Sequence, residues 1–156
     1  MISPELLRRY PFFGYMNEEQ FQKVAMISDE IELEEDDIVF ESGAVGDALY
    51  MLLDGAVEIH YVVFDQINPE LRKEFQVGDI NPGEVFGLSA VIAPRKLTAT
   101  AKVTLGGTAI KINADNLMAM CAEDPQFGYG LMTQVAKTTL ERLGFTRTQL
   151  AAARNI

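Results

Sequence analysis

The sequence predicts a mainly β domain, a β-sandwich or jelly roll, with helices at both ends. Three observations carry this prediction. Apolar residues follow a helical spacing in residues 1–28, alternate with a period of two in residues 29–112, and return to a helical spacing in residues 113–156. Short strands without long helices between them favour stacked sheets, which limit exposed sheet edges. We therefore expect one domain over residues 1–156.

The first 28 residues are expected to form two short helices around a bend. Leu7 and Tyr10 lie on one face of the first helix, and the Pro-Phe-Phe-Gly run at residues 11–14 ends it. Asn17 is the predicted N-cap of the second helix, because its side-chain oxygen can accept from free N–H groups of the first turn. These helices should cover one end of the sheet.

The central segment is expected to form short antiparallel strands separated by turns rich in Gly or Asp. The predicted strands are Glu30–Leu33, Ile38–Phe40, Leu49–Leu53, Ala56–Phe64, Lys73–Val77, Leu97–Val103 and Thr108–Ile112. Within the fourth of these, His60 alternates with Val57, Ile59 and Tyr61. It is therefore expected to face solvent on the side opposite those three residues.

The last segment predicts a short helix at Asp115–Glu123 and, restarting at Pro125, a long helix to about Ala153. A stripe with the spacing of a coiled-coil seam follows the long helix. Its members are Met132, Ala136, Thr139, Leu143, Thr146 and Leu150. The stripe fits two alternatives, a helix packed on its own β-core and a helix that pairs in a homodimer.

Charge and cysteine content restrict the partners and the compartment. Acidic residues outnumber basic ones by 23 to 13, giving a net charge of −10. Such a field repels nucleic acid and anionic membranes, so neither is an expected partner. The chain has one cysteine, Cys121, and its N-terminus lacks the order of a signal peptide. We therefore expect a cytoplasmic protein without a disulfide.

No combination of residues in the sequence predicts catalysis or a metal site. Metal-binding jelly rolls use several histidines, and His60 is the single histidine of this chain. No histidine stands near Cys121 to activate its thiol. We expect a protein that is not an enzyme and that holds no metal.

Two glycine-containing motifs stand in order along the central segment. The first, residues 43–57, places Gly43, Gly46 and Gly55 around a strand-like apolar run, and these glycines suit turns that need positive φ. The second, Pro-Gly-Glu-Val-Phe-Gly at residues 82–87, precedes a short apolar run and then Leu-Thr-Ala-Thr-Ala.

With the helices around them, these motifs resemble the cyclic-nucleotide-binding domain superfamily of bacterial catabolite activators and kinase regulatory subunits. The resemblance covers nearly the whole chain. It implies a double-stranded β-helix (jelly roll) with N-terminal helices and a long C-terminal helix, a regulatory role and a cyclic nucleotide as the ligand. It also identifies the second motif as similar to the family's phosphate-binding cassette. The chain ends where transcription factors of this family add a helix-turn-helix, so no DNA-binding domain is expected.

The cassette departs from the family pattern at two places. The family carries a glutamate for the ribose hydroxyl directly after the second glycine and an arginine for the phosphate about nine residues later. Leu88 and Leu97 hold those places here. Apolar side chains can neither accept from a hydroxyl nor neutralise a phosphate, and the two losses together should weaken binding about a thousandfold.

The leading prediction is therefore a non-enzymatic sensor domain with lost or altered cyclic nucleotide recognition. One alternative is a genuine cAMP- or cGMP-binding protein in which Lys96 or Arg95 reaches the phosphate, and another is a structural dimerisation module. In the first two cases a small ligand would move the C-terminal helices, with a hinge near residues 113–125. The candidate ligand-binding residues are Phe86, Gly87, Leu88, Ser89, Ala90, Arg95, Lys96, Leu97 and Thr98.

Overall fold

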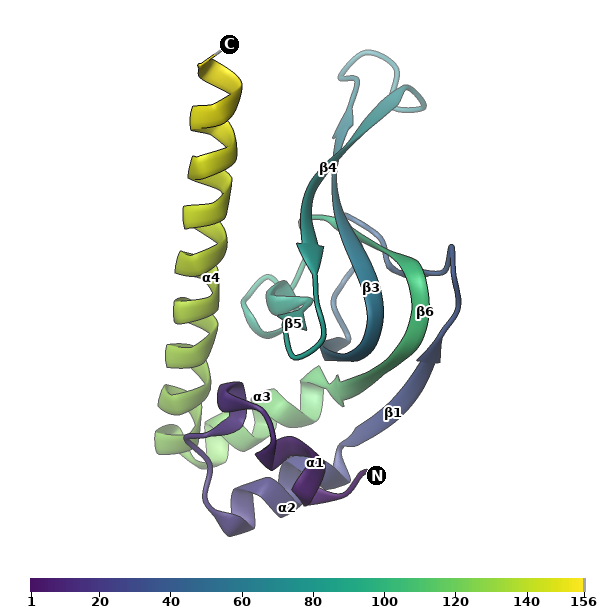
Figure 1. Ribbon diagram of the computed structural model, residues 1–156. Coiled ribbons are helices and arrows are strands. Elements are labelled where there is room, and N and C mark those ends of the chain that lie inside the picture. Colours follow the sequence, from purple (N-terminus) through teal and green to yellow (C-terminus); the bar gives the residue numbers. More distant parts are fainter. Residues whose placement is uncertain (156) are drawn as a thin grey trace.

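A strongly bent antiparallel sheet forms the centre of the protein, with small helices at its base and one long helix beside it (Figure 1). The structure, a computed structural model, describes residues 1–155. In chain order the elements are α1 (Pro4–Arg8), η1 (Pro11–Phe13), α2 (Glu18–Met26), β1 (Ser28–Leu33), β2 (Ile38–Phe40), β3 (Ala48–Phe64), β4 (Arg72–Ile80), β5 (Val85–Phe86), η2 (Leu88–Val91), β6 (Thr100–Asn113), α3 (Ala114–Glu123) and α4 (Pro125–Arg154). This order confirms the predicted mainly β fold with helices at both ends.

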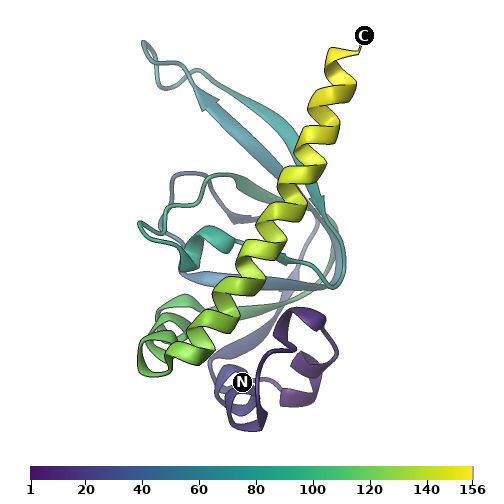
Figure 2. The same cartoon turned by 90° about the vertical axis from the view of Figure 1, so that its left-hand side faces the viewer.

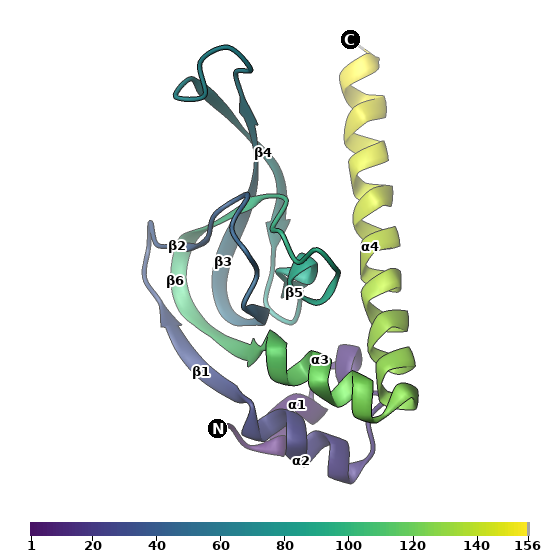
Figure 3. The same ribbon diagram turned by 180° about the vertical axis from the view of Figure 1, so that it is seen from behind.

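Six strands in the described part of the chain pair in the order β1-β6-β3-β4, with β2 on β6 and β5 on β3. Seen from behind, β1 and β2 lie on one side of the rolled sheet and α4 on the other (Figure 3). The predicted N-cap of α2 is confirmed. Asn17 Oδ1 accepts from the Gln20 backbone N–H at 2.9 Å, and the Gln20 side chain accepts from the Asn17 N–H.

Two pairs of predicted strands are single bent strands. A turn was expected at Gly55, but β3 continues through it, and β6 likewise continues through Gly106 and Gly107. At φ +96°, Gly55 lies against β6 so closely that a Cβ there would be 2.5 Å from the Leu105 carbonyl oxygen. The pairing register shifts repeatedly between Leu52 and Val57. Opposed bulges therefore bend the two strands together without ending them.

Two hydrophobic clusters share strand β3, which is buried on both faces at its start. Leu49 and Met51 face the cluster built with the small helices and the first half of α4. Tyr50 and Leu52 face the opposite cluster, inside the roll. Successive side chains of a strand alternate between its faces, so one short apolar run serves both cores. It thereby fixes the helices to the roll.

The hairpin of β3 and β4 extends beyond the roll as an arm (Figures 1 and 2). A register shift between Ile59 and His60 leaves Val77 of β4 without a partner on β3. On β3, Tyr61 is exposed and Val62 is buried, the reverse of the predicted alternation. The prediction of a solvent-facing His60 is also wrong, because its side chain is 17% exposed and lies 3.1 Å from a Glu58 carboxylate oxygen.

Helix α4 crosses the roll diagonally in Figure 2 and continues past it. Its first half is fixed by burial of Phe127, Leu131 and Val135 in the core. Leu131 and Val135 each precede by one position a residue of the predicted seam, Met132 or Ala136. Farther along the predicted seam, Leu143 and Leu150 are exposed. Among residues 1–155, none of the helices combines the length and the hydropathy needed to cross a bilayer.

Candidate functional site

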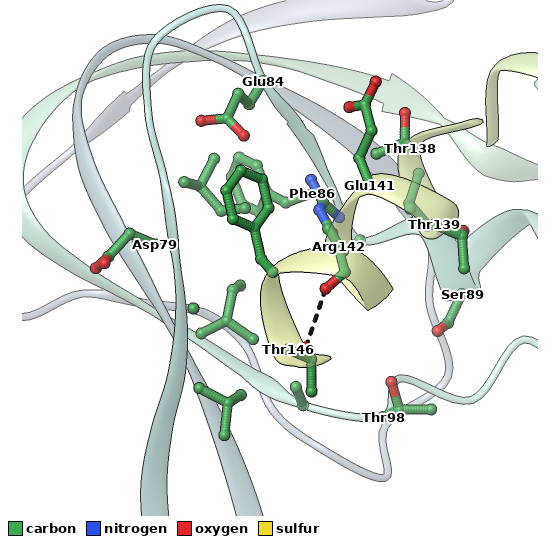
Figure 4. A pocket seen from close by; sticks show the side chains of 18 of the residues that line it. Asp79, Glu84, Phe86, Ser89, Thr98, Thr138, Thr139, Glu141, Arg142 and Thr146 are labelled. Carbon is green, nitrogen blue, oxygen red and sulfur yellow. Dashed lines mark hydrogen bonds between the residues drawn. The ribbon is translucent and has the colours of Figure 1, made fainter. Parts of the chain in front are cut away.

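A cavity of about 550 Å³ lies between the cassette, the inner face of the β3–β4 arm and α4 (Figure 4). This size is typical of small-molecule sites. Most of its wall is apolar, although polar and charged residues also contribute. The apolar side chains are Phe40, Ile59, Val77, Ile80, Phe86, Leu88, Leu97, Ala99 and Phe145. The polar and charged side chains are Asp79, Asn81, Glu84, Ser89, Thr98, Thr138, Thr139, Glu141, Arg142, Thr146 and Gln149.

The backbone of the cassette is positioned by a left-handed glycine. Gly87 has φ +78°, and a Cβ at this position would lie 3.3 Å from the Ala48 carbonyl oxygen and from the rings of Phe40 and Tyr50. Only glycine adopts this conformation without strain. The chain then turns into η2, so that Leu88 and Ser89 line the cavity.

An aromatic cluster supports the base of the cavity. The rings of Tyr50 and Phe86 stack with centroids 5.2 Å apart, and Phe40 lies about equally close to both, at 5.9 and 6.1 Å. Burial, with a smaller contribution from Asp47, raises the pKa of the Tyr50 phenol to about 12. Tyr50 therefore stays neutral and serves as packing.

The structure brings six of the nine predicted site residues to the cavity. These are Phe86, Gly87, Leu88, Ser89, Leu97 and Thr98. Leu97 is only 5% exposed, and its N–H and carbonyl are fixed by hydrogen bonds to Ala44 and Gly43. Leu88 is half-buried and packs against the helical core. Leu88 and Leu97, the positions at which the resemblance predicts a glutamate and an arginine, thus form part of the cavity wall.

The other three predicted residues do not line the cavity. Ala90 is fully buried, and Gly46 packs on it so tightly that a Cβ at Gly46 would lie 2.7 Å from its Cα. Close approach, not the expected positive φ, explains Gly46. The Arg95 guanidinium donates to the carbonyl oxygens of Ala90 and Gly46 and to the Asp115 carboxylate, at 2.8, 3.1 and 2.6 Å. Lys96 is exposed and pairs through its backbone with Val45.

One functional candidate escaped the sequence reasoning. Arg142 projects from α4 into the cavity (Figure 4). Its guanidinium donates to the Val85 carbonyl oxygen on β5. Burial lowers the pKa of this guanidinium, and the charges of Glu84 and Glu141 oppose that shift. A sequence signal did exist, because Arg142 extends the buried stripe of Leu131, Val135 and Thr138 by one more helical turn. An arginine in the stripe of α4 that faces the roll is expected to place its positive charge between the helix and the roll.

The charges around the cavity differ in their exposure. Arg142 is half-buried, whereas Asp79, Glu84 and Glu141 are exposed at its edge. Solvent screens the exposed carboxylates more than the cation in the interior. Cys121 lies elsewhere, on α3, and burial raises the pKa of its thiol, which opposes the thiolate form needed by a nucleophile. No group of three His, Cys, Asp or Glu side chains among residues 1–155 has the arrangement of a metal site.

Comparison with known proteins places these features in a family. The sequence profile described as the cyclic nucleotide-binding domain matches residues 30–124. A solved structure of a cyclic nucleotide-binding protein from Geobacter metallireducens is 33% identical, with a TM-score of 0.79 over 92% of this chain and 99% of that one. No curated protein matches the sequence.

Two further structures share the fold at lower identity. The N-terminal domain of a transcriptional regulator from Streptomyces coelicolor is 25% identical, with a TM-score of 0.63 over 92% of this chain and 94% of that one. The sensor domain of the transcriptional regulator DNR from Pseudomonas aeruginosa is 18% identical, with a TM-score of 0.67 over 86% and 91%. These neighbours are sensor and regulator domains.

Proposed function

The chain belongs to the cyclic nucleotide-binding domain family, and we propose that it is a non-catalytic regulatory module that does not recognise a cyclic nucleotide in the usual way. In this proposal residues 1–156 act as one domain that senses a small ligand in the cavity between cassette and α4. The occupied cavity would change the position of α4, which carries the output to a partner protein.

The observation that carries the proposal is the pair of leucines in the cassette. Leu88 and Leu97 both line the cavity, and neither provides an acceptor for a ribose hydroxyl or a charge for a phosphate. A phosphate seated at these two positions meets no charged partner from the cassette, because the cation of the cavity wall, Arg142, stands on α4 and donates to Val85.

The geometry gives little support to cyclic nucleotide binding through Arg95 or Lys96. To reach the cavity, Arg95 would have to give up three hydrogen bonds that join the cassette to Gly46 and to α3. Lys96 is a neighbour of the lining residue Leu97, but its own side chain is not part of the cavity wall. Either rescue would also leave the ribose without a carboxylate at the position after Gly87, which Leu88 holds.

A thermal-shift titration of the wild-type protein tests the proposal. We expect the unfolding midpoint to stay unchanged with cAMP and with cGMP at millimolar concentration, because a ligand stabilises a protein only when its concentration exceeds its Kd. A rise of several degrees with either nucleotide would contradict the proposal and favour the cyclic-nucleotide alternative.

We further propose that the module is a homodimer through α4. In its second half this helix exposes several large apolar side chains: Leu140 at 67%, Leu143 at 41%, Phe145 at 72% and Leu150 at 53%. The β3–β4 arm beside it exposes others, among them Phe64 at 49% and Phe75 at 50%. Exposed apolar surface of this extent on neighbouring elements is typical of an interaction site. A second α4 would cover the seam at Leu143 and Leu150.

The net charge and the single thiol indicate the class of partner and the compartment that we propose. A net charge of −10 opposes contact with nucleic acid or an anionic membrane, so the proposed partners are a second copy and a protein. The single thiol of Cys121, whose pKa is raised by burial, suits a reducing compartment, and we place the module in the cytoplasm.

A further inference from the structure

Arg142 is the only Lys, Arg or His side chain among residues 1–155 that lines the cavity. Its guanidinium has five N–H donors, and one nitrogen donates to the Val85 carbonyl oxygen. The described residues offer it no second acceptor at hydrogen-bond distance, and no carboxylate lies within ion-pair distance. Several donors of this cation are therefore free to bind a ligand without breaking the contact to β5.

The partial burial of Arg142 makes an anionic partner favourable. Loss of solvent is the main cause of its lowered pKa, and one neutral carbonyl oxygen compensates little of that loss. Glu84 and Glu141 oppose the shift from a distance, but both are exposed and screened by solvent. An anion that entered the cavity would meet the cation where screening is weakest.

The shape and the walls of the cavity indicate the kind of anion. A guanidinium presents parallel N–H groups that match the two oxygens of a carboxylate. Much of the remaining surface is apolar, with Phe40, Phe86 and Phe145 contributing rings and Leu88 and Leu97 branched chains, and hydroxyl and amide groups lie between them. The cavity volume of about 550 Å³ suits a small organic molecule. The exposed carboxylates at the edge disfavour ligands that carry several negative charges.

We propose that the cavity binds a small organic acid with an apolar or aromatic body, and that Arg142 on α4 holds its carboxylate. This inference rests on the proposed function and names the class of ligand for the same cavity. The anchoring cation then comes from the terminal helix and not from the cassette. Because the cation lies on the proposed moving element, binding of the acid would directly favour the position of α4 seen in this structure.

The test compares three acids with their uncharged amides. Benzoate, phenylacetate and indole-3-acetate are titrated to about 10 mM at constant ionic strength against benzamide, phenylacetamide and indole-3-acetamide, with thermal shift followed by calorimetry. The proteins are the wild type, Arg142→Gln, Arg142→Lys and the matched control Arg147→Gln. Arg147 lies on the same helix, is exposed and does not line the cavity.

We expect at least one acid to raise the wild-type and Arg147→Gln midpoints by about 5 °C while its amide does not. Arg142→Gln should lower the affinity for that acid at least about tenfold, and Arg142→Lys should fall between the two because it keeps the charge and loses the fork. The proposal is wrong if no acid stabilises the wild type, or if acids stabilise Arg142→Gln equally well. Stabilisation by cAMP or cGMP in parallel titrations would instead contradict the proposed function.

Discussion

The Arg142 guanidinium on α4 donates a hydrogen bond to the Val85 carbonyl oxygen on β5, across 57 residues of sequence. This bond is the polar link between the cassette and the second half of the long helix. Closer to the start of α4, apolar burial of Leu131 and Val135 holds the helix, but beyond Thr138 its residues are exposed apart from Arg142. We therefore expect Arg142 to help hold the second half of α4 against the roll.

Hydrogen exchange tests this role of Arg142. In Arg142→Gln, we expect amides of residues 138–149 to exchange faster, because local opening of the helix no longer breaks the contact to Val85. Arg147→Gln removes a charge from the same helix but leaves the contact to Val85 intact. Its amides should therefore exchange at the wild-type rate. Equal protection in all three proteins would show that α4 is held by other contacts.

A pair of glycine variants tests the opposed bulges of β3 and β6. Gly43 and Gly55 both have positive φ, at +88° and +96°, but a Cβ meets nothing within 4 Å at Gly43 and a carbonyl oxygen at 2.5 Å at Gly55. Urea unfolding should show a loss of about 1 kcal/mol for Gly43→Ala and of about 3 kcal/mol or more for Gly55→Ala. Similar losses for both variants would mean that the strands separate easily at Gly55.

These bulges also show where sequence reasoning stops. Turns were expected at Gly55 and between Val103 and Thr108, since glycine is common in turns. Two strands can instead bend together when their glycines face each other, and that pairing is set by tertiary contacts. Local patterns did predict the N-cap at Asn17 and the restart of the helix at Pro125, because capping depends on a few adjacent residues.

The sequence predicted those parts of the candidate site that lie within one continuous segment. The glycine at position 87 and the replacements at Leu88 and Leu97 are readable from one continuous motif. Whether Arg95 reaches the ligand was not readable, because its acceptors lie on Gly46 and Asp115 as well as on the cassette. The position of Arg142 beside the cassette was not readable either, because residues of α4 and of the cassette are far apart in the sequence and meet only in the folded protein.

Asp124 at the start of α4 gives a prediction about pH. Its carboxylate accepts from the Phe127 N–H at 3.2 Å and from the Gln20 side chain at 2.9 Å, and these bonds lower its pKa. A carboxyl group whose pKa is lower in the folded state stabilises the protein above its unfolded pKa and loses that contribution as the pH falls through the folded value. The stability of the wild type should therefore decrease in this range below about pH 4.

The matched variant is Asp124→Asn, which keeps a capping oxygen but has no carboxyl group to titrate. Thermal unfolding from neutral pH down to pH 3 should show the wild type more stable at neutral pH and the difference shrinking in acid. Parallel curves for the two proteins would contradict a role for the ionised carboxylate.

The proposed dimer has its own test. Leu143→Glu places a charge on the exposed seam of α4, whereas Thr148→Glu places one on the same helix outside that seam. Sedimentation at micromolar concentration should give a dimer for the wild type and Thr148→Glu and a monomer for Leu143→Glu, because like charges would face each other across the helix pair. A monomeric wild type at that concentration would exclude the dimer.

The central claim is that Leu88 and Leu97 remove cyclic nucleotide recognition from an otherwise typical cassette. Calorimetric titration of cAMP into the wild type and into the double variant Leu88→Glu, Leu97→Arg tests it most directly. The variant restores the carboxylate and the cation that the family uses, and we predict that it binds cAMP about a thousandfold more tightly than the wild type, which shows no heat of binding at micromolar nucleotide. Micromolar binding of cAMP by the wild type would contradict the claim.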